Sequence, residues 1–251
     1  MKTALLIPCL IATLGTALAH AEDAAPQPDS RLETVTVARS GKTAVMKYGG
    51  LNRALSGVQE YGEGLFRFEF RLLSAKEGKP LASPELALSH ADFYRTLPVR
   101  ADGLVVLPIL PPDKAGETEL VTNQPHDSVS LHGTLLPAMQ PDQVDLATVR
   151  RMVRLAERMR SELLPWYARL FFPRMGGLRV CSAKPGWDLQ WRDENGQLWA
   201  LPVPEAADEK DPLATPPDSS RACMILTGKE NWPDSARLAA PAGTTLSIKP
   251  L

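Results

Sequence analysis

One stretch of the chain, residues 145–177, carries a long helical pattern, and the segments on either side of it are typical of short strands. Apolar residues recur there at steps of three and four, which places them on one face of an α-helix. They are Leu146, Val149, Met152, Val153, Ala156, Met159 and Leu163. Asp145 is a suitable N-cap because its carboxylate can accept hydrogen bonds from the first free N–H groups. Pro165 cannot continue the helix, so we expect it to end near Leu164.

The end of this stretch predicts a second, shorter helix at residues 166–172. Pro165 suits the first position of a helix, and Pro173 with the pair Gly176-Gly177 then stops it. Aromatic residues at helical spacing usually pack, so we expect the aromatic side chains to fill a core; an anchoring role is the alternative. They are Trp166, Tyr167, Phe171 and Phe172. The run is too short and too interrupted to span a bilayer.

The polar face of the long helix is rich in arginine. Between Asp145 and Arg179 there are eight Arg and three acidic residues, a local positive excess. One interpretation is a solvated face whose arginine stems cover apolar surface and whose charges pair with acids of the flanking regions. The other is a docking surface for an acidic protein partner or an anionic envelope component, bound by Arg151, Arg154 and Arg158, which lie side by side at helical spacing.

The first residues predict a secretory signal peptide. Lys2 precedes an apolar run, residues 4–18, and Ala19-His20-Ala21 is a typical cleavage site, so we expect residues 1–21 to be removed after Ala21. Residues 22–44 follow as a linker with a first strand at 32–38. The mature chain is therefore expected in the periplasm or outside the cell, without a transmembrane helix.

Export changes the interpretation of the cysteines. Removal of Cys9 with the leader leaves Cys181 and Cys223, and an even pair in an oxidising compartment indicates a disulfide. Closing a loop of this length stabilises the fold by roughly 4 kcal/mol in the chain-entropy model. A free thiol nucleophile or a pair of metal ligands is the alternative, although neither cysteine has a histidine or another cysteine close by in sequence.

Composition excludes one class of function and suits a β-rich fold. The chain has 28 Lys and Arg against 29 Asp and Glu, and loss of Lys2 leaves a mature net charge of −2, which does not indicate nucleic-acid binding. A hydrophobic content of 44% is enough for a packed core. The 23 prolines favour short strands, sheet edges and turns.

The clearest strand is residues 65–73, in which Phe66, Phe68, Phe70 and Leu72 fall on one face. A short helix is expected at 51–55. Further strands are predicted at residues 44–48, 85–89, 97–100, 104–107, 119–123 and 129–135. Strands at this spacing, separated by turn residues, argue for a β-sandwich over residues 45–140.

Two turns within this region match a known family. Gly78-Lys79-Pro80-Leu81 follows a strand, and Asp102-Gly103 forms a hairpin signal before an apolar strand. The run from Phe66 to Ile109 thereby resembles the carboxypeptidase regulatory-like (transthyretin-like) β-sandwich. The resemblance implies a fold and no activity, because such modules are mostly stabilising or binding units.

The remainder, residues 178–251, is predicted to form a second β-rich domain. Strands are expected at 178–183, 187–192, 197–203, 224–226, 237–240 and 245–248, with an Asn195-Gly196 turn and a mobile polar loop at 204–220. The predicted fold class is mainly β (α+β). It comprises an N-terminal β-sandwich (45–140), a central helical connector (141–177) and a small, disulfide-linked C-terminal β-sheet (178–251).

No motif specifies a reaction. His90-Ala91-Asp92 and His126-Asp127 place carboxylates beside imidazoles, but a metal site needs three or four converging ligands, so we expect no metal and no cofactor. The chain lacks a G-x-S-x-G nucleophile turn and a glycine-rich phosphate loop. We expect a non-catalytic binding or accessory protein of the cell envelope. The alternatives are a secreted hydrolase using His90, Asp92 and His126, and a subunit of an envelope or secretion assembly with a large exposed apolar surface.

Overall fold

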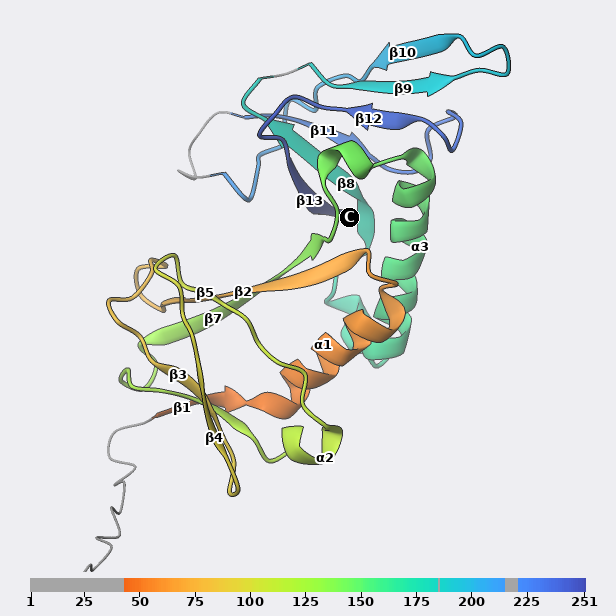
Figure 1. Cartoon of the computed structure of the whole chain (residues 1–251). Coiled ribbons are helices and arrows are strands. Elements are labelled where there is room, and N and C mark those ends of the chain that lie inside the picture. The colour runs from red at the N-terminus through yellow and green to blue at the C-terminus, as the bar shows by residue number, and fades with distance from the viewer. Residues whose placement is uncertain (1–42, 185, 215–220) are drawn as a thin grey trace, which may run out of the picture. The chain divides into compact units, whose positions relative to one another are not determined.

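The computed structural model describes residues 43–184, 186–214 and 221–251, and within them the strands form four small antiparallel sheets (Figure 1). The predicted signal peptide and the strand predicted at 32–38 lie outside these residues. The described part is mostly β, with several small sheets and one disulfide in the C-terminal region, so the predicted fold class is confirmed.

The first half contains two sheets that share a core. One has the order β1-β6-β3-β4 and the other β5-β2-β7. The strands are β1 (Thr43–Lys47), β2 (Phe66–Ser74), β3 (Leu86–Ser89), β4 (Tyr94–Leu97), β5 (Leu104–Val105), β6 (Glu119–Thr122) and β7 (Val129–Pro137). Phe70 and Leu72 of β2 pack with Leu86 and Leu88 of β3 and Leu120 of β6. The strand predicted at 97–100 lies earlier and ends at Leu97, because the next residue is a proline, which has no N–H for the ladder.

Helix α1, Tyr48–Tyr61, is much longer than the helix predicted at 51–55. Tyr48 is fully buried, and its hydroxyl donates a hydrogen bond of 2.5 Å to the carbonyl of Pro108. Burial raises the pKa of this phenol to about 12. One turn later, the Asn52 amide donates to and accepts from the backbone of Leu110. These contacts fasten the start of α1 to the loop after β5, which leads to the short helix α2 (Pro112–Ala115).

Helix α3, Leu146–Leu163, matches the predicted helix. The Asp145 carboxylate accepts a hydrogen bond of 2.8 Å from the N–H of Thr148, as expected for an N-cap. Leu146, Val149, Met152, Leu155 and Met159 are buried. The predicted apolar face did not include Leu155. The buried face of α3 is therefore rotated slightly from the predicted face.

The second half contains two three-stranded sheets, β11-β8-β13 and β10-β9-β12. Their strands are β8 (Met175–Ser182), β9 (Asp188–Arg192), β10 (Leu198–Pro202), β11 (Ala222–Leu226), β12 (Arg237–Ala239) and β13 (Thr245–Pro250). Leu178 and Val180 of β8 belong to the same core as Met152 of α3. That core also contains Val58 of α1 and Phe66 of β2, so it crosses residue 140, and the two halves pack as one unit.

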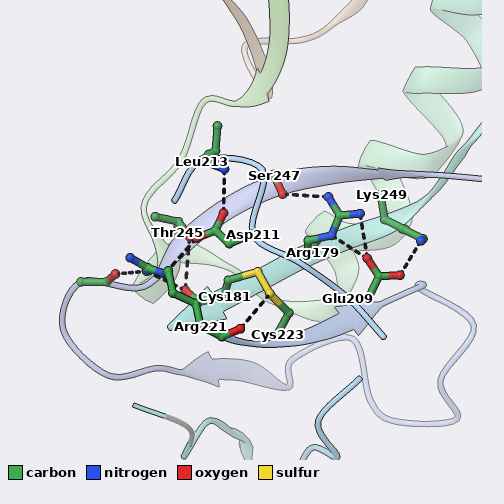
Figure 2. Close-up of a disulfide and its surroundings, with 11 residues drawn as sticks. Arg179, Cys181, Glu209, Asp211, Leu213, Arg221, Cys223, Thr245, Ser247 and Lys249 are labelled. Atoms are coloured by element: carbon green, nitrogen blue, oxygen red, sulfur yellow. Dashed lines mark hydrogen bonds and ion pairs between the residues drawn. A yellow bond between two sulfur atoms is a disulfide. The ribbon is translucent and has the colours of Figure 1, made fainter. Parts of the chain in front are cut away.

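The predicted disulfide is present. Cys181 of β8 and Cys223 of β11 are directly opposite each other in the strand register, with their Cα atoms 4.1 Å apart (Figure 2). They lie on the same side of β8 as Arg179, while Leu178 and Val180 point to the other side and into the core. The disulfide therefore belongs to the outer face of this sheet.

A polar segment covers this outer face. The Asp211 carboxylate pairs with Arg221 at 2.9 Å and accepts hydrogen bonds from the Thr245 hydroxyl and the N–H of Leu213 (Figure 2). Glu209 pairs with Arg179 at 2.8 Å and with Lys249. The loop at 204–220 was predicted to be mobile; up to residue 214 two carboxylates hold it on the sheet, and residues 215–220 lie outside the described part.

Acid should weaken this attachment. The hydrogen bond from Lys249, together with Arg179, lowers the pKa of Glu209 below its ordinary value of 4.5. A carboxylate with a lowered folded-state pKa contributes stability above its unfolded-state pKa and loses it as the pH falls through the folded-state value. We expect the free energy of unfolding to fall as the pH drops below about 4.5. Urea unfolding across that range measures it.

The variant Glu209→Gln should lower the free energy of unfolding at neutral pH by about 2 kcal/mol and flatten its acid dependence. Glu205→Gln is the matched control, because Glu205 is exposed on the same segment. An acid dependence that is equal in Glu209→Gln and in the wild type would contradict this account.

Candidate functional site

An exposed aromatic segment follows α3. We use this name for residues 165–173, which hold five exposed large apolar side chains: Trp166 (75% exposed), Tyr167 (57%), Leu170 (78%), Phe171 (83%) and Phe172 (54%). The predicted helix at 166–172 and the predicted core role of these aromatics are therefore wrong. Only a single 3₁₀ turn forms, η2 (Ala168–Leu170), because Pro165 ends the α-helix and the segment then turns back.

Arginines hold the backbone of the aromatic segment. The Arg160 guanidinium donates to the carbonyls of Phe172, at 3.1 Å, and Arg169. Arg169 donates in turn to the carbonyl of Leu164, at 2.9 Å, and to that of Ser161. The backbone is thus tied to the end of α3 while the apolar side chains project away from it. Surface apolar groups of this size and density mark interaction sites.

A third arginine braces another loop. Arg150 donates to the carbonyls of Gly228, at 2.9 Å, Glu230 and Trp232, and pairs with Asp234. Part of the positive excess of residues 145–179 is therefore structural, as the first interpretation of this face expected.

The three arginines predicted to bind a partner remain at the surface of α3. Arg151 pairs with Glu63, just beyond α1, and the Arg158 guanidinium lies 5.6 Å from the centre of the Tyr61 ring. Arg154 is exposed, and its side chain makes no hydrogen bond or ion pair with the part of the chain that the structure describes. A binding role for Arg151, Arg154 and Arg158 stays a prediction.

A mostly apolar cavity of about 430 Å³ lies beside the aromatic segment. We call it the α1–α3 cavity. Ala54 and Val58 of α1 and Ala156, Met159 and Leu163 of α3 line two of its sides. Three strands of two sheets line it, β2 and β7 through the cross-strand pair Phe68 and Leu135, and β13 through Ile248. Phe172 and Pro173 bring the aromatic segment to its edge. Because these elements are far apart in sequence, no local pattern could have predicted the cavity.

The polar part of this lining is cationic. Arg53, Arg160 and Arg174 contribute to it, and no Asp or Glu does. Arg160 is committed to carbonyls of the aromatic segment, and Arg174 lies 3.7 Å from Glu157. A second cavity of about 460 Å³ lies against another side of α3, but Glu157, Arg174 and Lys229 give it a mixed charge, so it is less suited to an apolar ligand.

Of the residues of the alternative hydrolase site, His90 and Asp92 lie close together, but His126 is separated from them. His90 lies between Asp92, at 3.8 Å, and Glu117, at 3.4 Å, and His126 pairs with Asp127 at 2.6 Å. In the register of β3 and β6, Ser89 lies opposite Glu119 and Leu86 lies opposite Thr122. His90 and His126 therefore follow opposite ends of this strand pair. Within residues 43–184, 186–214 and 221–251, no three or more His, Cys, Asp or Glu are grouped to hold a metal ion.

Among the described helices, none is long and apolar enough to cross a bilayer. Comparison of the chain with protein families, with curated proteins and with solved structures found no match. The resemblance to transthyretin-like sandwiches thus rests on turn residues. Two of them, Gly78 (φ 65°) and Gly103 (φ 82°), adopt the left-handed conformation that favours glycine.

The separation of the histidines makes a direct test of catalysis possible. The third histidine of the described residues, His132 of β7, lies 3.0 Å from the Ser130 hydroxyl. Replacing His90, His126 and His132 together with Gln should cost only local hydrogen bonds, about 1 kcal/mol each. We expect neither the wild type nor the triple variant to hydrolyse simple nitrophenyl esters above the rate in buffer. A wild-type activity that falls about a hundredfold or more in a folded triple variant would contradict the non-catalytic account.

Proposed function

We propose that the protein is a non-catalytic binding protein of the cell envelope and that the α1–α3 cavity binds the apolar chain of a ligand. The observation that carries this proposal is the mostly apolar lining of the cavity. Its volume of about 430 Å³ falls within the usual range for ligand sites, about 300–1,000 Å³. The dispersed histidines argue against an active site of the His/Asp type. The leader pattern and the disulfide favour an oxidising compartment such as the periplasm.

The energetics favour a chain-like ligand and set its limits. Burying about ten methylene groups contributes about 8 kcal/mol, and association costs at least about 4 kcal/mol. The difference between these two free energies corresponds to a dissociation constant of about 1 mM for the alkyl chain alone. An apolar chain is therefore sufficient for weak binding, and a polar group of the ligand must add the rest.

Gly50 offers a way to close the cavity without disturbing the core. It lies in α1 on the cavity lining, and a Cβ atom at this position would meet no atom within 4 Å. We expect Gly50→Phe to weaken binding of an uncharged fluorophore, N-phenyl-1-naphthylamine, about tenfold by occupying the space. Gly50→Ala is the control and should bind like the wild type. Fluorescence titration measures both, and equal affinity of the Phe variant and the wild type would contradict the proposal.

A second candidate function is peripheral docking on an anionic bilayer, favoured by the exposed aromatic segment. Trp and Tyr are enriched at membrane interfaces, where the ring is buried and its polar tip stays hydrated. The stretch from Leu163 to Arg179 carries three arginines and no acid, which suits anionic headgroups. The surface arginines Arg151, Arg154 and Arg158 add to the positive charge of this region.

Changing Arg151, Arg154 and Arg158 together to Gln tests this second function. The fold should persist, because an exposed ion pair contributes less than about 1 kcal/mol. Co-sedimentation with anionic vesicles should weaken, and the loss should be larger at low salt, where screening is least. Vesicle binding equal to that of the wild type would contradict a role for these arginines. Binding to an acidic protein without vesicle binding would favour an assembly subunit.

A further inference from the structure

We infer that the ligand of the α1–α3 cavity is a single-chain anionic amphiphile, whose acidic headgroup pairs with Arg53. This inference rests on the proposed function, because it assigns the polar end of the ligand whose chain the cavity would bind. The simplest members of the class carry a carboxylate or a phosphate at the end of an alkyl chain.

The charge around the cavity is positive. Its lining contains three arginines and no carboxylate, so the cavity favours a negative ligand group over a positive one. Cationic amphiphiles would meet only like charge there. Neutral chains would find apolar contacts but no charged partner.

Of the three arginines of the lining, only Arg53 has its donors free of partners in the described part of the chain. Arg160 donates to the carbonyls of Phe172 and Arg169, and only 16% of its side chain is exposed. Arg174 faces Glu157 across 3.7 Å. The Arg53 guanidinium forms no hydrogen bond or ion pair with any residue in the described ranges, and Arg53 is exposed. Its donors are therefore open to a ligand.

The position of Arg53 suits a headgroup at the edge of the cavity. Arg53 lies three residues after Gly50 on α1, so both are on the same face of the helix, and both line the cavity. Open space surrounds the missing side chain of Gly50, which leaves room for a headgroup beside Arg53. A guanidinium binds carboxylate and phosphate groups through two parallel hydrogen bonds, a geometry that lysine does not offer.

Isothermal titration with four probes below their micelle concentrations tests the inference: dodecanoate, dodecyl phosphate, dodecanol and inorganic phosphate. The wild type should bind both anionic chains at least about tenfold more tightly than dodecanol, which corresponds to about 1.4 kcal/mol. Inorganic phosphate alone should bind too weakly to detect, because it lacks the chain. A preference between the carboxylate and the phosphate would identify the headgroup.

The variant Arg53→Gln should lose the preference for anionic chains while its affinity for dodecanol stays that of the wild type. Arg53→Lys should retain only part of the preference, because it keeps the charge without the paired donors. The matched control is Arg237→Gln, which removes another exposed arginine, on β12, that does not line the cavity. It should behave like the wild type.

The outcomes separate this inference from the proposed function. If dodecanol and dodecanoate bind equally, and Arg53→Gln changes neither, the headgroup assignment is wrong while the cavity still binds chains. If Arg237→Gln reduces the preference as much as Arg53→Gln does, the preference reflects the overall positive charge of the protein and the assignment to Arg53 is wrong. If no chain binds the wild type, the proposed function itself fails.

Discussion

Strand β2 is the element on which both hydrophobic cores depend. Phe66 belongs to the core of α3 and the C-terminal sheets, whereas Phe70 and Leu72 belong to the core of the sandwich. Phe68 lies between them, packs against both cores and reaches the lining of the α1–α3 cavity. β7 pairs with β2 along all nine of its residues and keeps this strand in one register. A one-residue slip would turn every one of these side chains to the opposite face.

The arginines of the α3 region keep the backbone of the aromatic segment ordered while its apolar side chains are exposed. A loop with outward-facing aromatics gains little from burial, so its backbone must be held in another way. Arg160 and Arg169 supply the donors for its carbonyls, and charge-assisted hydrogen bonds are among the stronger ones in proteins. Arg154 of α3 and Arg53 of α1 have no partners in the described part of the chain. The arginines that hold the backbone are therefore different from those that remain open to a ligand.

Local patterns predicted the parts of the fold that depend on local forces. The period of α3, its Asp145 cap, the alternation of β2 and the Cys181–Cys223 pair were all visible in sequence. The length of α1 was not, because Gly49, Gly50 and Gly57 weaken its helical signal while tertiary contacts of Tyr48 and Asn52 stabilise it. Every residue carries a backbone carbonyl, so the sequence does not indicate which carbonyls accept hydrogen bonds from arginines. The contacts that hold the backbone of the aromatic segment could therefore not be predicted. The cavity is lined by six segments that are separated in sequence, so it could not be predicted either.

A crystal structure of the protein with bound dodecanoate tests the central claim most directly. We expect density for the alkyl chain between α1 and α3, against Phe68 and Met159, with the carboxylate within hydrogen-bonding distance of the Arg53 guanidinium. A cavity filled by Phe172 or by other side chains of the protein itself, with the fatty acid bound elsewhere or absent at saturating concentration, would contradict it.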